Sequence, residues 1–212
     1  MIEKGLNSQE SDNLPNHRYS GEPLRLYDFM YECIVCCPKC EADAVVNIPW
    51  FSDVNNASLK CFRCHFTEDM GSRKRYRLPA IATCHVCSSK LTPSMDNFKK
   101  IPPYIKQICG QCKAENTIKE NWESYHLKYN EQGINDPAFG LPLWLIESVK
   151  GNILWAFNYK HLAEIKNYVK ANLRERTTDK FKMTMVEKLP EFITSHKNRN
   201  LDLKSIQKME LK

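Results

Sequence analysis

The octapeptide CIVCCPKC, residues 33–40, places four cysteines in eight positions, more than one tetrahedral metal site would take from a single short segment. All ten cysteines lie between residues 33 and 112 of the 212-residue chain. Eight of them form four C-x-x-C pairs, Cys37/Cys40, Cys61/Cys64, Cys84/Cys87 and Cys109/Cys112. Successive pairs are separated by 20, 19 and 21 residues, so one four-cysteine pattern occurs twice in tandem.

Paired cysteines at this spacing indicate metal binding. A two-residue gap lets a tight turn direct two sulfurs at one ion, and two such turns supply the four thiolates of a structural zinc site. Iron in a rubredoxin-like site is the alternative, because the same ligands hold it. Nothing in the sequence calls for electron transfer, so we expect two structural zinc ions. The expected ligands are Cys37, Cys40, Cys61, Cys64, Cys84, Cys87, Cys109 and Cys112.

Within the octapeptide, Cys37 and Cys40 are the expected ligands. Pro38 pre-sets the turn between them, and their separation from Cys61 matches the second copy of the pattern, whereas a Cys33/Cys36 pair would lengthen that separation to 24 residues. We therefore expect Cys33 and Cys36 to be small apolar residues of a strand that enters the turn. Cys36 could replace its neighbour Cys37 if that residue were oxidised or mutated.

The tandem pattern resembles the zinc-ribbon superfamily, in which a cysteine turn, a β-hairpin and a second cysteine turn surround one metal. The resemblance covers about residues 30–115 and implies a fold and a metal, but no particular partner. In the first copy, AVVNIPW (44–50) and ASLKCF (57–62) are expected strands around the polar turn FSDVNN. In the second copy, prolines in TPSMDNFKKIPPY favour loop, so its strands should be short.

The order of pairing stays open in the sequence. Sequential pairing gives two independent ribbons, whereas joining the first pair to the third and the second to the fourth gives the cross-braced arrangement of RING-type domains. That arrangement usually includes a histidine ligand, which four complete cysteine pairs make unnecessary. We expect His65 and His85 to be exposed or to lie beside the metal without binding it.

No catalytic residue is expected. Four thiolates close the coordination shell of a zinc ion, whereas catalytic zinc keeps a position open for water. The sequence contains no H-x-E of the deaminase type, no G-x-x-x-x-G-K-[ST], no G-x-S-x-G and no H-E-x-x-H. The chain is therefore expected not to be an enzyme and to have no small-molecule substrate.

A basic stretch covers the cysteine region. Residues 60–113 contain eleven Lys and Arg against three acidic residues, a formal +8, which the charge of two four-thiolate zinc sites would lower. RKRYR, residues 73–77, joins the two copies and concentrates four charges around one tyrosine. Such a run can neutralise phosphates and stack a base, or it can be a solvated linker. The candidate nucleic-acid contacts are Arg73, Lys74, Arg75, Tyr76 and Arg77.

The C-terminal sequence contains no cysteine, and its patterns indicate a hairpin followed by helices. LPLWLIESV (141–149) and ILWAFN (153–158) indicate a β-hairpin with core tryptophans. Asn158 is a plausible N-cap for the helix YKHLAEIKNYVKANLRER, in which His161 is expected to pack or cap rather than catalyse. A second helical stretch is expected from about Met183 to His196, interrupted near Pro190, because proline suits the first turn of a helix better than its interior. Asn198 or Asn200 could cap a last helix, LDLKSIQKMEL.

The expected fold class is α+β, with two tandem zinc-binding β-ribbons followed by a β-hairpin and a helical module. The expected divisions are a disordered N-terminus (1–21), ribbon 1 with its basic linker (22–78), ribbon 2 (79–118), an acidic linker (119–138) and the C-terminal module (139–212). The run LWAFNYKHLAEIKNYVKANLRER after tandem cysteine turns is similar to the tails of bacterial zinc-ribbon proteins, some labelled after the primosomal replication-restart helicase. Residues 144–212 contain no helicase motif.

Two functions fit the sequence. The first is a nucleic-acid-binding protein that contacts DNA or RNA through its basic region, and the second is an adaptor whose ribbons dock on a protein partner. Charge alone does not separate them, because acidic protein surfaces attract the same residues. With no apolar N-terminal segment and no apolar run long enough for a membrane span, a soluble cytoplasmic protein with no membrane partner is expected.

Overall fold

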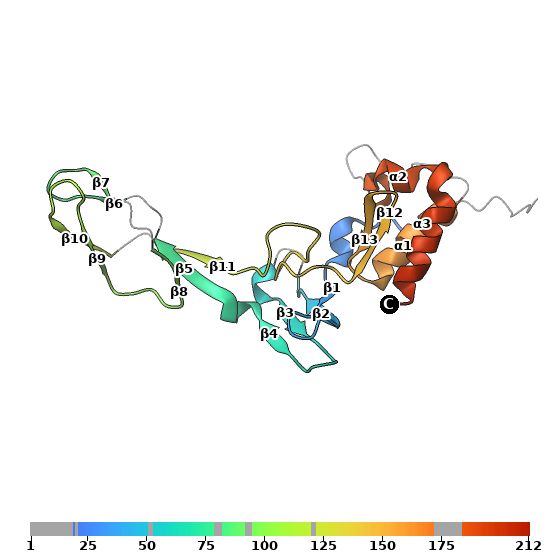
Figure 1. The fold of residues 1–212 in the computed structure, drawn as a ribbon, viewed down its shortest axis with the longest axis horizontal. Coiled ribbons are helices and arrows are strands. Elements are labelled where there is room, and N and C mark those ends of the chain that lie inside the picture. The colour runs from blue at the N-terminus through green and yellow to red at the C-terminus, as the bar shows by residue number, and fades with distance from the viewer. Residues whose placement is uncertain are drawn as a thin grey trace, which may run out of the picture. The chain divides into compact units, whose positions relative to one another are not determined.

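The chain is α+β in its computed structural model, with mixed strands and a few helices. Its contacts divide it into two units: a cysteine unit, Phe29–Leu145, and a helical unit, Met1–Asp28 with Ile146–Lys212. The strands and helices of both are labelled in Figure 1. The structure describes residues 19, 21–50, 53–78, 82–91, 95–119, 122–171 and 184–212. Most of the N-terminus expected to be disordered (1–21) lies outside these residues, and the finer domain boundaries stay predictions.

The first half of the cysteine unit is a four-stranded antiparallel sheet in the order β1-β2-β3-β4. Its strands are β1 (Glu32–Cys36), β2 (Asp43–Asn47), β3 (Ser58–Lys60) and β4 (Thr67–Asp69). The two strands predicted between the first cysteine pairs are confirmed as β2 and β3, and β1 is the strand expected to enter the first turn. Buried side chains of Val35, Ala44, Val46 and Leu59 form the core of this sheet.

RKRYR belongs to a second sheet. β5 (Lys74–Leu78) follows the short 3-10 helix η3 (Met70–Arg73) and is the central strand of a three-stranded antiparallel sheet. Its neighbours are β8 (Met95–Phe98) on one side and β11 (Glu123–His126) on the other. The segment expected to be an acidic linker therefore also supplies a strand, and its Glu123 pairs with Arg77 of β5 at 3.1 Å.

The second cysteine pattern forms short hairpin pieces, as the prolines predict. β6 (Ala82–Thr83) pairs with β7 (Lys90–Leu91), and β9 (Ile105–Ile108) pairs with β10 (Glu115–Ile118), all antiparallel. Pro102 and Pro103 lie in the loop before β9, and Pro93 is outside the described residues. A small cluster of Leu91 with Cys84 and Cys109 is the core of this part, so it buries little apolar surface of its own.

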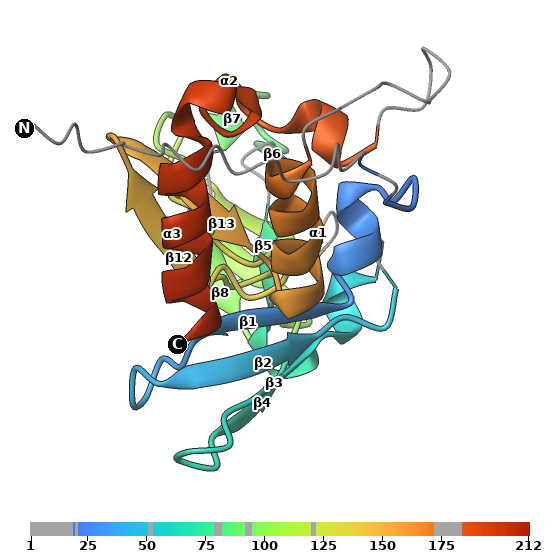
Figure 2. The ribbon, with the colours of Figure 1, turned by 90° about the vertical axis from the view of Figure 1, so that its right-hand side faces the viewer.

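The helical unit contains the predicted hairpin. β12 (Leu145–Val149) and β13 (Asn152–Ala156) are joined by Lys150 and Gly151, whose φ angles of 50° and 78° are those of a tight two-residue hairpin turn. Helix α1 (Tyr159–Lys170) follows, and α3 (Arg199–Glu210) packs beside it. Figure 2 shows the two helices next to the hairpin.

Helix α1 begins where the sequence predicts. The side chain of Asn158 accepts a hydrogen bond from the backbone N–H of His161 at 2.9 Å, and Leu162, Ile165 and Val169 are buried on one face. The helix ends at Lys170, and the remainder of its predicted span, residues 172–176, lies outside the described residues.

The second predicted helical stretch is interrupted near Pro190, as expected, and it consists of shorter pieces than the sequence suggests. They are the 3-10 helices η4 (Val186–Lys188) and η5 (His196–Asn198) and the single helical turn α2 (Glu191–Thr194). Pro190 is the N-cap of α2, because it lacks an N–H and cannot continue a helix from η4. The last helix is confirmed as α3. Of the helices described, none combines the length and the apolar composition that crossing a membrane requires.

His161 is buried in the helical unit. It is 2% exposed, and its Nδ1 accepts a hydrogen bond from the backbone N–H of Phe157 at 3.2 Å. Burial lowers the pKa of His161 to about 4. The packing and capping role expected for this histidine agrees with that environment.

The buried, neutral state of His161 makes the stability of the helical unit depend on pH. Because its folded pKa is below the unfolded value, neutral His161 stabilises the fold above about pH 6.5, and that contribution, up to about 3 kcal/mol, is lost as the pH falls toward 4. In a proton NMR titration, with the signal assigned by its absence in His161→Gln, we expect no titration of His161 between pH 8 and about pH 5.5. A midpoint near 6.5 would contradict the buried, neutral state.

One buried carboxylate organises the loop between β11 and β12. Asp136 is 2% exposed and accepts hydrogen bonds from the backbone N–H groups of Ala138, Phe139 and Leu141 at 2.9, 2.8 and 2.6 Å. In the same loop Gly140 has a φ of 71°, and a Cβ there would lie 2.2 Å from the carbonyl oxygen of Asn130. The loop therefore depends on one acidic side chain and one glycine.

We accordingly expect Asp136→Ala to destabilise the cysteine unit by roughly 3 kcal/mol, because three buried N–H groups lose their acceptor. Asp96→Ala, at an exposed acidic residue of β8, is the matched control and should change stability by less than about 0.5 kcal/mol. Chemical denaturation of the zinc-loaded proteins measures both. Equal effects of the two substitutions would argue against this role of Asp136.

Candidate metal centres

All four cysteine pairs adopt one backbone geometry. In each, the N–H of the first cysteine donates to the carbonyl oxygen five residues later, at 2.7 to 2.9 Å. The residue after the second cysteine has a positive φ in every case, although none of the four is glycine. These residues are Glu41 (60°), His65 (58°), Ser88 (56°) and Lys113 (63°). A left-handed conformation costs a non-glycine residue about 1–2 kcal/mol, so the turns need compensation from elsewhere.

The turns bring the sulfurs together in two clusters. In each cluster the four Sγ atoms lie within 4.8 Å of one another. The short separations are Cys37–Cys64 3.6 Å, Cys40–Cys61 3.6 Å, Cys84–Cys112 3.5 Å and Cys87–Cys109 3.7 Å. A tetrahedral zinc ion with bonds of about 2.3 Å requires sulfurs about 3.8 Å apart, whereas a disulfide requires about 2.05 Å. Both clusters are therefore consistent with structural zinc, two ions in all.

The clusters also answer the question of pairing. The first contains the first and second C-x-x-C pairs, and the second contains the third and fourth. Pairing is thus sequential, and the cross-braced arrangement does not occur. Four sulfur ligands fill a tetrahedral shell, so an ion at either place would serve the fold and would lack an open position for water.

Backbone N–H groups of the turns favour the thiolate form that a metal needs. The N–H of Cys64 is the main cause that lowers the pKa of the Cys61 thiol to about 7. The N–H of Cys112, followed by the hydroxyl of Ser89, lowers the pKa of Cys109 to about 6. At Cys64 and Cys112 the backbone N–H groups of Phe66 and Ala114 act in the same direction, but burial and hydrogen bonds with the neighbouring cysteines outweigh them and raise the pKa of each thiol to about 12. Because metal binding displaces the thiol proton, the turn N–H groups help zinc binding most at Cys61 and Cys109.

The second cluster has polar neighbours that the sequence did not reveal. Asn116, 4% exposed, donates its side-chain NH₂ to the Sγ of Cys84 at 3.6 Å and accepts the backbone N–H of His85 at 3.0 Å. Nδ1 of His85 lies 2.9 Å from the same amide oxygen. The Ser89 hydroxyl lies 2.9 Å from the Sγ of Cys87. Neither Asn116 nor Ser89 has a spacing that distinguishes it from an ordinary strand or turn residue.

The remaining cysteines and histidines lie outside the clusters. Cys33 is fully buried in β1, where burial raises the pKa of its thiol and the S–H donates to the carbonyl of Met30. Cys36 ends β1 beside Cys37 and is partly exposed. His65 is an exposed turn residue, and His85 contacts the second cluster through Asn116.

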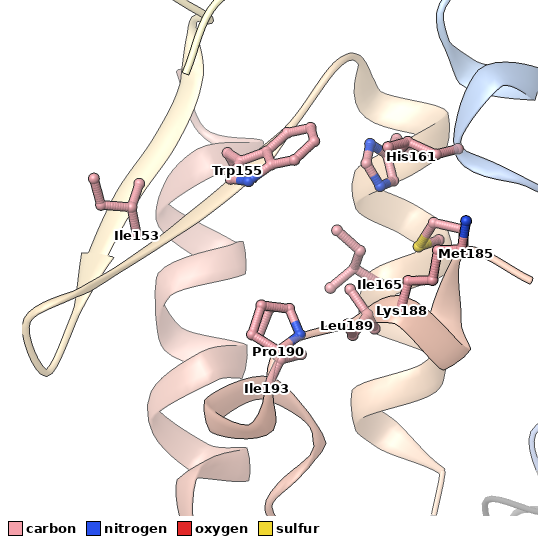
Figure 3. Close-up of a pocket in the computed structure, with 10 residues that line it drawn as sticks. Ile153, Trp155, His161, Ile165, Met185, Lys188, Leu189, Pro190 and Ile193 are labelled. Carbon is pink, nitrogen blue, oxygen red and sulfur yellow. The ribbon is translucent and has the colours of Figure 1, made fainter. Parts of the chain in front are cut away.

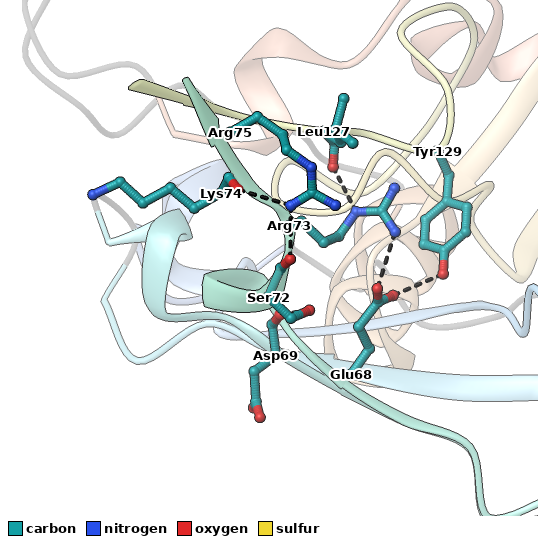
Figure 4. Close-up of polar contacts among 8 residues, drawn as sticks. All are labelled: Glu68, Asp69, Ser72, Arg73, Lys74, Arg75, Leu127 and Tyr129. Atoms are coloured by element: carbon teal, nitrogen blue, oxygen red, sulfur yellow. Dashed lines mark hydrogen bonds and ion pairs between the residues drawn. The ribbon is translucent and has the colours of Figure 1, made fainter. Parts of the chain in front are cut away.

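RKRYR does not present all its cations to solvent. The guanidinium of Arg73 donates to Glu68 at 3.0 Å and to the carbonyl of Leu127 at 2.6 Å, and it lies 4.0 Å from the ring centre of Tyr129 (Figure 4). The Tyr129 hydroxyl donates to the other oxygen of Glu68 at 2.7 Å. Arg73 therefore has a structural role in the cysteine unit, as part of a cluster whose other members the sequence did not indicate.

The next four residues of RKRYR divide between the two faces of β5. Arg75 donates to the carbonyls of Ser72 and Lys74 and to the side chain of Asn97, and Arg77 pairs with Glu123. Lys74 is exposed, with its Nζ 5.5 Å from the ring centre of Tyr76. Among the residues that the structure describes, Lys74 has no acidic partner. It is the cation of this strand that remains open to an external anion.

A hollow of about 160 Å³ lies in the helical unit (Figure 3). Its wall is mainly apolar, with Trp155, Ile165 and Met185 among its residues, and it also includes Lys188 and the buried ring of His161. Ligand sites in proteins combine an apolar wall with several converging polar groups. Within the described part of the chain the hollow offers few such groups, so we assign it no chemistry.

Comparisons with protein-family models, with curated proteins and with solved structures find no match for this chain. The resemblance to zinc ribbons thus stays a prediction, which rests on the cysteine spacing.

The two cysteine clusters predict how many zinc ions the chain and its cysteine variants should contain. We expect about two zinc ions per chain, about one in Cys37→Ser, and two in Cys33→Ser, because Cys33 lies outside both clusters. Mass spectrometry of protein purified without chelators measures this.

Excess chelator should unfold the cysteine unit and leave the helical circular dichroism signal of the other unit largely unchanged. Two ions retained in Cys37→Ser, or one in Cys33→Ser, would contradict the assignment.

Proposed function

We propose that the chain is a non-enzymatic zinc protein of the zinc-ribbon type whose cysteine unit binds DNA or RNA through the phosphate backbone. Closed four-thiolate shells suit zinc that stabilises a fold, and the small core around Leu91 needs such support. A reducing cytoplasm would keep the thiols available for metal.

One observation carries the proposal: many cations of the cysteine unit have no acidic partner among the described residues. Arg73, Arg77 and Lys106 are paired with Glu68, Glu123 and Glu115. Other basic residues between 60 and 100 are exposed and without an ion pair within the described ranges. They are Lys60, Arg63, Lys74, Lys90, Lys99 and Lys100.

The charge balance around these cations supports an anionic partner. A zinc ion with four thiolates carries a formal charge of −2, but its sulfurs accept hydrogen bonds from nearby backbone N–H groups, and half of the ligands are buried. The side chains that reach into solvent are mainly basic. Binding to a phosphate backbone would release its counterions, and this gain is independent of base sequence.

The salt dependence of binding tests the proposal. We expect the zinc-loaded chain to bind DNA or RNA at low salt. The double variant Lys74→Gln/Lys99→Gln should lower the slope of log K against log salt by about one to two, since each lost phosphate contact contributes about 0.7–0.9. The control Lys160→Gln/Lys170→Gln removes the same charge from exposed positions of α1 and should leave the slope unchanged.

Fluorescence anisotropy with labelled DNA and RNA gives the slopes. Absence of binding at low salt would reject the proposal, and equal effects of the two double variants would show that net charge, not the cysteine unit, determines binding.

Protein docking is a second candidate, favoured by apolar side chains exposed at the cysteine turns. Phe62, Val86 and Ile108, each next to or between zinc ligands, are 61%, 61% and 66% exposed. Solvent-exposed apolar residues on a metal-stabilised turn suit a protein interface. Under this alternative a protein partner stays bound after nuclease treatment, whereas nucleic-acid binding predicts its loss.

A further inference from the structure

The sheet β11-β5-β8 has two chemically different faces. Directly opposed residues of antiparallel strands share a face, and successive residues alternate. In β5, Tyr76 is opposite Ser124 and Phe98, and Lys74 is opposite His126. The other face contains Arg75 and Arg77, opposite Tyr125 and Glu123.

Aromatic rings gather on the face of Tyr76. Phe98, which pairs with Tyr76, meets the ring of Trp122 edge to face, with ring centres 5.4 Å apart. Trp122 immediately precedes β11, so the alternation of that strand places it on the same face as Ser124. All three rings are partly exposed, although Leu78 beside them is buried. The rings therefore cover an apolar patch of the sheet and keep part of their own surface in contact with solvent.

The polar edges of the face are suited to an anion. Lys74 and His126 are directly opposite each other, and the pKa of His126 is lowered by burial and then by the charge of Lys74. Beyond the end of β8 the chain continues into Lys99 and Lys100, both exposed. The Tyr76 hydroxyl has no hydrogen-bond partner within the part of the chain that the structure describes, whereas the Tyr125 hydroxyl of the other face accepts the backbone N–H of Asn97.

We propose that this face binds single-stranded nucleic acid, with unpaired bases stacked on Tyr76 and its aromatic neighbours and with phosphates near Lys74. The inference rests on the proposed function and specifies its substrate class. Bases in a duplex are stacked on one another and do not offer their ring faces, whereas the bases of a single strand do. Any base can stack on an aromatic side chain, so this face should prefer single strands to duplexes and show little preference for base sequence.

The test compares four labelled ligands with the zinc-loaded full chain at one salt concentration. They are single-stranded DNA, single-stranded RNA, a duplex of the same DNA sequence, and an abasic DNA strand of equal length. We expect one or both single strands to bind at least tenfold more tightly than the duplex, and also than the abasic strand, which keeps the phosphates and lacks the bases. The DNA and RNA arms establish which strand the chain prefers.

Three variants test where the bases bind. Tyr76→Leu should weaken single-strand binding about tenfold, within the 5–150-fold range expected for loss of one stacked base, and should leave duplex binding unchanged. Tyr76→Phe keeps the ring and should bind like the parent. Tyr125→Leu removes a tyrosine from the opposite face of the same sheet and should change single-strand binding less than twofold. A zinc content of two per chain shows that the cysteine turns of each variant are intact, and an unchanged unfolding midpoint in chemical denaturation shows that the sheet is folded.

The outcomes separate this inference from the function on which it rests. Binding at low salt with equal or higher affinity for the duplex, or with equal affinity for the abasic strand, overturns base stacking but leaves phosphate binding intact. Equal losses in Tyr76→Leu and Tyr125→Leu overturn the choice of face. Absence of binding to every ligand at low salt rejects both, and a protein partner retained after nuclease digestion would then identify the surface as a docking site.

Discussion

The coordination of four sulfurs around one centre is the constraint on which the cysteine unit depends. Each cysteine turn ends in a non-glycine residue with a positive φ, at a cost of about 1–2 kcal/mol apiece, and each turn closes on only a short stretch of strand. The small core around Leu91 contributes little to offset this cost. Apparent zinc affinities of small metal-binding domains correspond to about 10–16 kcal/mol, enough to offset several strained residues.

The same constraint explains why four turns of unrelated sequence look alike. The four turns share only their cysteines; their sequences are CPKC, CFRC, CHVC and CGQC. In all four, however, the N–H of the first cysteine donates a hydrogen bond to the carbonyl oxygen five residues later. Two sulfurs must reach one ion, and the turn N–H groups must face those sulfurs, so few backbone conformations remain. The intervening residues are then free to vary, and several of them carry exposed apolar or basic side chains.

Sequence patterns predicted the parts of the structure that depend on spacing and periodicity. The cysteine turns, the hairpin of β12 and β13, the Asn158 cap and α3 all follow from local rules that act over a few residues. They did not predict the pairing order, because both orders use the same spacing and only the tertiary path of the chain decides. Asn116 was also missed, since its contact with Cys84 joins residues 32 positions apart.

RKRYR shows why counting the charges in a short segment overestimates the number of cations that a strand can offer to one partner. In the sequence these residues are adjacent and look like one basic patch. In a β-strand, however, successive side chains point to opposite faces of the sheet. Arg73 is engaged by Glu68 and Leu127 before the strand begins, and Arg75 is bound to backbone carbonyls and Asn97.

What remains of RKRYR is a lysine and a tyrosine on one face and an ion-paired arginine on the other. Whether a residue of this segment can contact nucleic acid therefore depends on the face of the sheet on which its side chain lies. The proposed contact with nucleic acid accordingly depends on the ring of Tyr76 and the lysines near it more than on the summed charge of the segment.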